Sequence, residues 1–345
     1  MATLTVRAPT KRDRMRLRNV RQRRVSLLAP WDPHADPAGR QAHGLKSTAV
    51  TLLASDIIVA AVDDEVCAYL VYERGDERYR WNICWLGAGS PRVDATDEVA
   101  SELWLALLEE GVRGAGRSGA RRLFAYCAPD SIESESLRQA GFSGFTEYEV
   151  LRGRFKRGLR ESIPVREQHE SDLWSIHQLY NRTTPRPVQF AEAFTSDAWS
   201  TDSASRIPFR NRQLLGYVLP TEDGIGAACH IDLTASCPMV SLLCDDHLSH
   251  AIPSIVAEAL EHASLHGDVD VVLPAYQLDR QSSFVNLGFA SRKRVVAMVR
   301  HTTATAVQMP LKTEVLKLSE ARPAVSIPYR GLTFAGIECR VRDGA

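Results

Sequence analysis

The sequence predicts an α/β protein of two similar halves, in each of which helices flank a mixed, mostly antiparallel sheet. Three observations carry this prediction. The chain has 345 residues, about twice the length of a usual domain. Strand-like and helix-like runs follow one another in an order that occurs twice along the chain, which is unlikely by chance. The first strands of each half are separated by short turns, which is typical of an antiparallel meander.

Composition and charge exclude several classes of protein. The 42 Lys and Arg residues balance 42 Asp and Glu residues, so the chain lacks the basic excess of a dedicated nucleic-acid binder. No stretch has the roughly 20 apolar residues of a membrane span, and the amino terminus lacks the apolar core of a secretory signal. We therefore expect a cytoplasmic protein without nucleic-acid or membrane partners.

The cysteines indicate neither disulfides nor a metal site. There are seven, scattered and without a CxxC pair, whereas a disulfide framework or a structural zinc site favours an even set or close pairs. The run 244–250 contains metal-capable residue types, but their spacing defines no site. We expect no metal, and cysteines that are mostly buried apolar residues.

The first half is expected to open with a short strand over 4–7 and a basic helix between Lys11 and Arg24. This block holds eight Lys and Arg residues against the single acid Asp13. We interpret it as the solvated face of a helix, with a transit peptide or a phosphate-binding helix as alternatives. The expected apolar side of the helix consists of Met15, Val20 and Leu27 or Leu28.

Further along the first half, the pattern predicts a meander, a long helix and a closing strand. The three meander strands are expected over 57–62, 66–72 and 81–86. Thr96 is a plausible N-cap for the long helix, which carries apolar residues at helical spacing: Val99, Leu103, Ala106 and Leu107. A strand over 122–126, a short helix over 131–140 and a closing strand over 147–155 complete this half.

The second half repeats the order. Its expected elements are a strand over 163–165, a helix over 172–180, strands over 213–219, 225–233 and 240–244, a helix over about 253–266, a strand over 269–273, a short helix ending at Leu287 and a closing strand over 295–300. Gly224-Ile225-Gly226 has the spacing of a nucleotide-binding loop. Because strands flank it on both sides, we predict a hairpin turn there.

The short helix of each half ends in a similar motif. Residues 137–142 read Leu-Arg-Gln-Ala-Gly-Phe, and residues 284–289 read Phe-Val-Asn-Leu-Gly-Phe. Both resemble the Tyr-x-x-x-Gly-Phe ending of the GNAT acyltransferases (Gcn5-related N-acetyltransferases), and the element order of each half resembles their fold. The resemblance covers roughly 1–155 and 162–305. It implies two tandem GNAT-like domains, at 1–158 and 159–308, and we expect the tail over 309–345 to pack on them.

The resemblance also implies an activity, the transfer of an acyl group from acetyl-CoA or another acyl-CoA to an amine of a small molecule or a peptide. In the family, a glycine-bearing turn opens the main helix, whose N–H groups and dipole hold the pyrophosphate of the coenzyme. Catalysis is mostly the positioning of the thioester beside the amine, helped by a base. The resemblance places bond making where the fourth and fifth strands splay, near Leu242–Cys244 or near Cys84–Leu86.

Both halves depart from the family pattern. In the first, Asp97 and Glu98 stand in the segment of the glycine turn and would place negative charge beside a pyrophosphate. In the second, Pro253 stands in the first turn of the main helix and removes an N–H donor. The tyrosine that often protonates the leaving thiolate in the family is replaced by Leu137 in the first half and Phe284 in the second.

The second half is the better candidate for coenzyme binding, because the loop before its main helix carries no acid in its last six residues. The residues expected to contact the coenzyme are Leu242, Leu243, Cys244, His247, His250 and Ser254. Asp245 and Glu222 are candidate general bases. The alternative function is that of a non-catalytic protein with the GNAT fold that binds a ligand or a protein, which the missing glycines and tyrosine favour.

Two proline-bearing segments follow the first helix of each half, at 31–37 and 183–188. In GNAT proteins this region commonly lines the acceptor site. A purely structural connection between helices is the alternative.

Overall fold

The computed structural model describes residues 4–17, 20, 22–30, 56–74, 79–90, 93–154, 163–201, 213–233 and 237–302. The candidate acceptor segment at 31–37 and the tail over 309–345 lie outside these residues. None of the described helices is long and apolar enough to cross a bilayer.

The first half folds largely as its sequence predicts. Its elements are β1 (Leu4–Arg7), α1 (Lys11–Arg16), β2 (Arg23–Ser26), β3 (Asp56–Val62), β4 (Glu65–Arg74), β5 (Arg80–Ala88), α3 (Asp97–Arg117), β6 (Arg122–Cys127), α4 (Ile132–Gln139) and β7 (Ser143–Arg154). Strands β3, β4 and β5 form the predicted antiparallel meander. The hydroxyl of Thr96 accepts a hydrogen bond from the Val99 N–H, so Thr96 caps α3 as predicted.

The basic block does not form one helix, and that prediction is wrong. Helix α1 ends at Arg16, and residues 23–26 form strand β2 along β5. Met15, expected on the apolar side, is 63% exposed, whereas Val20 and Leu27 are buried. Hydrogen bonding to the edge of β5 outweighs the local helical pattern, because tertiary contacts override propensity.

The second half repeats the architecture of the first, with an additional helix. Its elements are β8 (Arg166–Glu167), η2 (Glu170–Asp172), α5 (Leu173–Thr183), α6 (Arg186–Glu192), η3 (Ser196–Trp199), β9 (Leu214–Thr221), β10 (Gly224–Asp232), β11 (Met239–Cys244), η4 (Asp246–Ala251), α7 (Ile252–His262), β12 (Asp268–Pro274), η5 (Ala275–Arg280), α8 (Gln281–Val285) and β13 (Ala290–His301), where η marks a 3₁₀ helix. The proline-bearing segment at 183–188 turns out to begin helix α6, with Pro185 as its N-cap. The opening strand lies at 166–167 instead of 163–165. The predicted hairpin between β9 and β10 is confirmed, and Gly224 adopts the positive φ of 122° that the turn requires.

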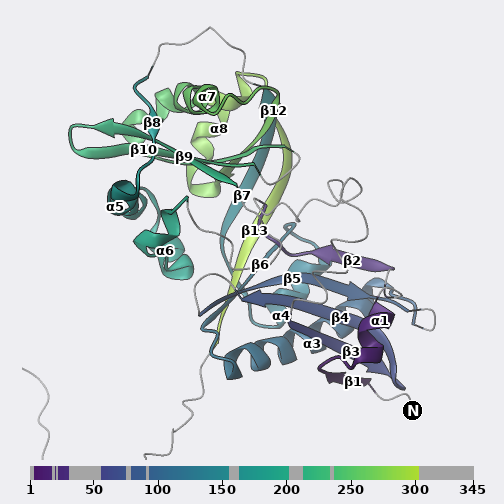
Figure 1. Ribbon diagram of the computed structural model, residues 1–345. Coiled ribbons are helices and arrows are strands. Elements are labelled where there is room, and N and C mark those ends of the chain that lie inside the picture. The colour runs from purple at the N-terminus through teal and green to yellow at the C-terminus, as the bar shows by residue number, and fades with distance from the viewer. Residues whose placement is uncertain are drawn as a thin grey trace, which may run out of the picture. The chain divides into compact units, whose positions relative to one another are not determined.

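Thirteen strands of the described residues belong to one mixed sheet that runs through both halves (Figure 1). The order is β1-β3-β4-β5-β6-β13-β7-β12-β11-β10-β9-β8, and β2 pairs with β5 off this path. Among the described strands, only the pairs β5–β6 and β11–β12 are parallel. The predicted fold class, a mixed and mostly antiparallel sheet flanked by helices, is confirmed.

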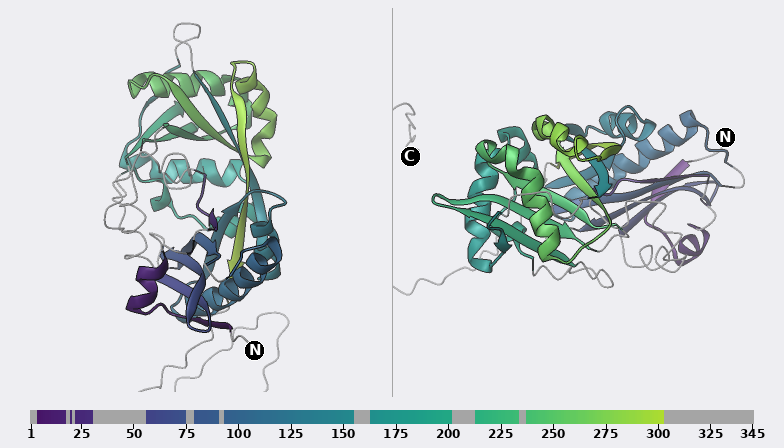
Figure 2. Two further views of the ribbon diagram at one scale, coloured as in Figure 1. Left: turned by 90° about the vertical axis from the view of Figure 1, so that its right-hand side faces the viewer. Right: turned by 90° about the horizontal axis from the view of Figure 1, so that it is seen from above.

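The closing strand of each half pairs with the other half. Strand β13 lies between β6 and β7, and β7 pairs with β12 on its other side (Figure 2). Side chains follow the same exchange. The Arg300 guanidinium on β13 donates a hydrogen bond of 2.9 Å to the carbonyl of Gly141, and Phe289 packs directly over Gly153 of β7. The domain limits at 158 and 308 stay a prediction, because the segment 155–162 lies outside the described residues.

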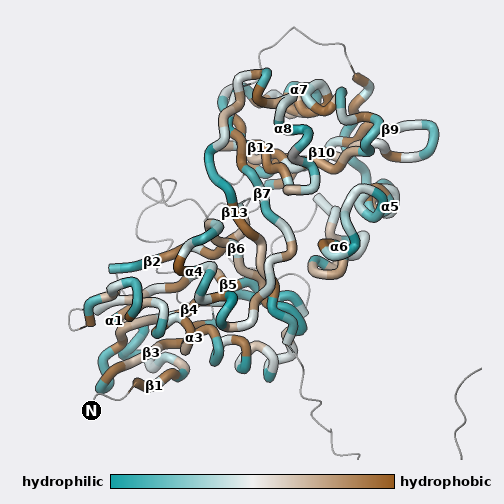
Figure 3. Tube along the Cα trace, turned by 180° about the vertical axis from the view of Figure 1, so that it is seen from behind, coloured by the Kyte–Doolittle hydropathy of each residue, from teal (hydrophilic) through white to brown (hydrophobic). Residues whose placement is uncertain are grey.

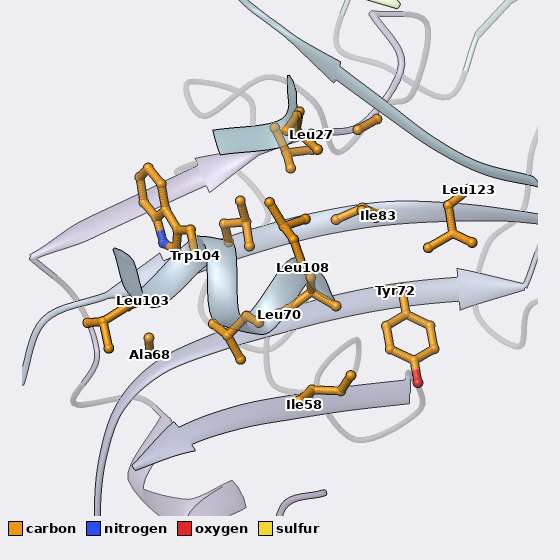
Figure 4. Close-up of a cluster of buried hydrophobic side chains, with 14 of the residues drawn as sticks. Leu27, Ile58, Ala68, Leu70, Tyr72, Ile83, Leu103, Trp104, Leu108 and Leu123 are labelled. Atoms are coloured by element: carbon orange, nitrogen blue, oxygen red, sulfur yellow. The ribbon is translucent and has the colours of Figure 1, made fainter. Parts of the chain in front are cut away.

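Much of the hydrophobic sequence lies in the strands (Figure 3), and buried apolar residues of strands and helices share hydrophobic clusters. In the first half, Leu103, Trp104 and Leu108 of α3 pack on Leu70 and Ile83 of the sheet (Figure 4). Trp104 is fully buried. In the second half, α7 and α8 pack on one face, while α5 packs through Ile176 and Leu179 on apolar residues of β9 and β10.

Candidate functional site

In the first half, the parallel strands β5 and β6 separate soon after they begin. They pair at three positions, from Arg80 with Arg122 to Asn82 with Phe124. Strand β2 pairs with the remaining part of β5, up to Ala88. The Leu27 N–H then donates to the Cys84 carbonyl at 3.0 Å, and the Tyr126 N–H donates to the Leu27 carbonyl at 2.9 Å. The splay between β5 and β6 is thus filled by the protein's own main chain.

The start of helix α3 in this half is also occupied by a side-chain pair. Arg23 forms an ion pair with Asp97, and its Nε donates to the carbonyl of Ala95 at 2.7 Å. Asp97 and Glu98 are exposed in the first turn, where their charge suits the helix dipole. The first half therefore offers neither a free strand edge in the splay nor an uncharged helix N-terminus.

In the second half, the parallel strands β11 and β12 also separate, but different groups lie at the point of separation. Strands β11 and β12 pair at three positions, from Met239 with Asp270 to Ser241 with Val272. Beyond these positions, no strand of the described residues lies between β11 and β12. Instead, the carbonyl of Cys244 accepts a hydrogen bond of 3.2 Å from Nη2 of Arg280. A side chain, not a main-chain segment, therefore caps the end of β11.

Two buried polar side chains at this end of the sheet have unused hydrogen-bonding atoms. Arg280 is 4% exposed and also pairs with Asp246 at 2.8 Å, yet its Nε and Nη1 have no partner among the described residues. Gln277, which is 1% exposed, has no partner for either atom of its amide. An unpaired buried polar group costs about 1–3 kcal/mol. A ligand with amide groups would supply the missing partners.

The structure places the residues predicted to contact the coenzyme around this same end. Leu242 and Cys244 are buried, Leu243 is half-buried, His247 and His250 are exposed in η4, and Ser254 is half-buried in the first turn of α7. Burial raises the pKa of the Cys244 thiol to about 12, so this thiol stays neutral at physiological pH. Pro253 lies in the first turn of α7, as expected from the sequence.

The two candidate bases lie at neighbouring strand ends. Asp245 forms an ion pair with Arg182 at 2.8 Å, and Glu222 is exposed in the turn between β9 and β10. No other contact of Glu222 distinguishes it from an ordinary turn residue. Their catalytic roles stay predictions.

A buried polar cluster that the sequence analysis missed lies where the two halves meet. We call it the junction cluster: Arg80, Tyr126, Tyr148, Tyr180, Glu192 and Tyr276. The Glu192 carboxylate is its centre. It accepts hydrogen bonds from the hydroxyls of Tyr180 at 2.8 Å and Tyr148 at 3.1 Å, and the residue is only 6% exposed.

Burial and charge set the ionisation of the junction cluster. Burial raises the pKa of Glu192, although the two tyrosine hydroxyls and the Arg80 guanidinium oppose this effect. Burial also raises the pKa of Tyr126 and of Tyr276 to about 12. The tyrosine hydroxyls are therefore neutral, and those of Tyr180 and Tyr148 donate to the carboxylate.

Arg80 is held beside this carboxylate by aromatic rings. Its guanidinium lies 3.9 Å from the ring centre of Phe124 and 5.0 Å from that of Phe194. Its Nη1 donates to the main-chain carbonyl of Glu192 at 3.3 Å. No sequence signal identifies Glu192. The proline-bearing segment singled out in the sequence ends at Val188, four residues before Glu192, which is the last residue of α6.

No cluster of three or more His, Cys, Asp and Glu side chains that could hold a metal ion occurs within the described part of the chain.

Comparison with known proteins yields matches among solved structures alone. No family model matches the sequence, and no curated protein matches it. The chain is similar to a GCN5-related N-acetyltransferase from Sphaerobacter thermophilus, with 13% identity over 87% of this chain and 96% of that chain and a TM-score of 0.47. It is also similar to a tandem GNAT protein from the clavulanic acid biosynthesis pathway, with 10% identity over 87% and 99% of the two chains and a TM-score of 0.48. A GCN5-related N-acetyltransferase from Kribbella flavida matches with 16% identity over 87% and 71% of the chains and a TM-score of 0.43. All three are described as GNAT proteins, the family that the two Gly-Phe endings resemble.

Proposed function

We propose that the protein is an acyl-CoA-dependent N-acyltransferase whose working site lies in the second half, at the carboxyl ends of β11 and β12. The observation that carries this proposal is the contrast between the two splays. In the first half, Leu27 bonds to both strands and uses the main-chain groups that a coenzyme arm would need. In the second half, the strands separate beyond Ser241 and the end of β11 is reached by a side chain alone.

The unpartnered groups at the second splay fit the coenzyme chemically. The arm of coenzyme A contains two amides, each with one N–H donor and one carbonyl acceptor. The Gln277 amide can donate and accept, and the free N–H groups of Arg280 can donate to a carbonyl. Binding would remove the cost of leaving these groups unpaired.

The pyrophosphate would lie at the start of α7. The exposed side chains of His247 and His250 and the hydroxyl of Ser254 are close to this helix N-terminus in sequence, where the helix dipole favours an anion. Pro253 removes one main-chain donor, so side-chain donors carry a larger share of the binding. Asp245 and Asp246 are both paired with arginines, which reduces their repulsion of a phosphate.

Calorimetric titration of the full chain with acetyl-CoA and with coenzyme A tests the proposal. We expect Gln277→Leu to weaken binding by about fivefold or more, since it removes both hydrogen-bonding atoms of the amide. The substitution removes an unpaired buried polar group, so the variant is expected to be at least as stable as the wild type. Glu98→Gln, in the first turn of α3, is expected to leave binding unchanged.

The alternative is a non-catalytic ligand-binding protein of the same fold. One observation favours it: Phe284, in the position of the family tyrosine, is fully buried and has no group that could protonate a thiolate. Binding of coenzyme A without release of free thiol from acetyl-CoA in the presence of amines would support this alternative. No binding at millimolar ligand by folded protein would overturn the coenzyme-dependent proposal altogether.

A further inference from the structure

The junction cluster contains two opposite charges that are not paired with each other or with other charged side chains. No cationic side chain of the described residues lies within 4.0 Å of the Glu192 carboxylate, and no carboxylate of these residues lies within 4.0 Å of the Arg80 guanidinium. A buried charge is normally paired, and Glu192 is buried whereas Arg80 is half-buried. Here, neutral hydroxyls hold the carboxylate, and aromatic rings together with the Tyr126 hydroxyl hold the guanidinium.

The two charges are close enough to act on each other. The guanidinium opposes the burial effect on Glu192 through space, and its Nη1 bonds to the main-chain carbonyl of the same residue. A ligand that carries both a cationic and an anionic group would complement these two side chains.

The cluster also lies at the end of the sheet where the proposed reaction takes place. Tyr148, a donor to Glu192, pairs across the sheet with Pro274, the last residue of β12. Tyr276 follows two residues later and interacts electrostatically with Glu192. A group held by Glu192 is thus near the carboxyl end of β12, on the sheet face that α6 covers through Ala191.

From this arrangement we infer that the junction cluster is a binding site for a free α-amino acid, with the ammonium group on Glu192 and the carboxylate on Arg80. The inference names the acceptor class of the proposed acyltransferase and rests on that proposal for its chemistry, but not for binding itself. Each half supplies one charge, since Arg80 opens β5 and Glu192 ends α6. The surrounding residues Phe124, Phe194, Met239 and Ala191 are apolar, so we expect an amino acid with an uncharged side chain.

The chemical step balances with acyl-CoA as the only co-reactant. The bound ammonium gives one proton to Glu192, and the free amine attacks the thioester carbonyl. The C–N bond forms and the C–S bond breaks, with the electron pair leaving on sulfur. The nitrogen loses a second proton to solvent, and the thiolate takes up the proton from Glu192. The products are an N-acyl amino acid and coenzyme A.

Ligand-observed NMR with the full chain, in the absence of any coenzyme, tests the inference. The probes are the standard free α-amino acids, with their primary amides, which lack the carboxylate, and their N-acetyl derivatives, which lack the amine. We expect at least one uncharged amino acid to bind and both derivatives to bind at least about tenfold more weakly, because each loses a charge-assisted contact.

Substitutions at the two charges separate their roles. Glu192→Gln should abolish the preference for the free amino acid over its N-acetyl derivative. Arg80→Gln should abolish the preference for the free amino acid over its primary amide. In the Arg80→Gln variant, the amino acid and its primary amide should bind with equal affinity. A general loss of structure would weaken both and would not make the two affinities equal. The controls are Glu109→Gln and Arg113→Gln, both on the exposed side of α3. Each control variant should bind the amino acid with the affinity of the wild type.

Equal binding of acids and amides by the wild type, or binding unaffected by both substitutions, would overturn the inference, as would the absence of any amino acid binding. Because no coenzyme is present, these outcomes do not depend on whether the proposed acyl transfer occurs. Conversely, failure of coenzyme binding in the calorimetric titration leaves the NMR result intact.

Discussion

The main-chain N–H of Leu27 donates a hydrogen bond of 3.0 Å to the carbonyl of Cys84, and the Leu27 carbonyl accepts one of 2.9 Å from Tyr126. One residue thus joins two parallel strands that have already separated. Main-chain hydrogen bonds of this kind satisfy buried polar groups that would otherwise be costly. The same bonds occupy the strand edges in the first half, which supports the proposal that a ligand binds in the second half.

Leu27→Ala is expected to lower the free energy of unfolding by about 2–5 kcal/mol, the range for truncating a buried leucine. The side chain is fully buried against the apolar cluster under α3. Urea denaturation measures the change, and Leu4→Ala is the control, because Leu4 is 45% exposed. If the filling of the first splay is purely structural, the variant binds acetyl-CoA with the same affinity per folded molecule as the wild type. A second molecule of bound coenzyme in the variant would contradict this assignment.

Gly153→Val tests the exchange of closing strands. A Cβ atom at Gly153 would lie 2.4 Å from the ring of Phe289, too close for any side chain without a shift of the ring or the strand. We expect a loss of about 1–3 kcal/mol of stability or more from overpacking, measured by thermal or urea unfolding. Gly144→Ala on the same strand is the control, since its Cβ would lie 3.4 Å from Val296. Equal stability of the two variants would show that β7 does not pack under Phe289.

Asp270→Asn tests a buried charge cluster that also joins the exchanged strands. The carboxylate of Asp270 is 2% exposed and accepts two hydrogen bonds from Arg152, at 2.7 and 2.8 Å, and one from Arg292 at 2.9 Å. Removing its charge leaves two guanidinium groups without their partner, so we expect a loss of about 1–3 kcal/mol by chemical denaturation. Asp268→Asn, two residues away in an exposed pair with Arg154, should cost less than about 1 kcal/mol. A similar loss of unfolding free energy in both variants would contradict the difference in burial between Asp270 and Asp268.

Asp13 is expected to make stability depend on pH in the acid range. Burial opposes ionisation of its carboxyl, but hydrogen bonds from Arg7 and from the hydroxyl and N–H of Thr10 outweigh burial and lower its pKa from 3.8 to about 2. The folded protein therefore binds this proton less readily than the unfolded chain does. The resulting stabilisation is present above about pH 4 and is lost as the pH falls through 2. Asp13→Asn should remove this part of the acid denaturation curve, and an unchanged slope between pH 4 and pH 2 would contradict the assignment.

The elements that the sequence predicted best are those set by local patterns. The meander from Asp56 to Ala88 follows from runs of apolar residues between acidic or glycine-bearing turns. The end of α1 could not be predicted in the same way, because strand β2 exists only through its pairing with β5. The exchange of β7 and β13 depends on which strands pair, and no local pattern encodes that choice. Glu192 is a further example, since its burial depends on tyrosines from three other elements, Tyr148, Tyr180 and Tyr276.

Glu192 is expected to produce the opposite pH dependence to that of Asp13. Burial raises its pKa above the ordinary value of 4.5, against the effect of Tyr180, Arg80 and Tyr148. The folded protein thus binds this proton more readily than the unfolded chain does, so the contribution of this group to stability is present below about pH 4.5 and declines as the pH rises through the raised pKa. Glu192→Gln keeps the shape of the side chain and cannot ionise. We expect its urea midpoint, compared with that of the wild type, to rise as the pH increases above 4.5 and to level off above the raised pKa, and the variant to be at least as stable as the wild type at neutral pH. A variant that is much less stable at neutral pH would show that the charged carboxylate stabilises the fold, and the junction cluster would then be a structural tie between the halves and not a binding site.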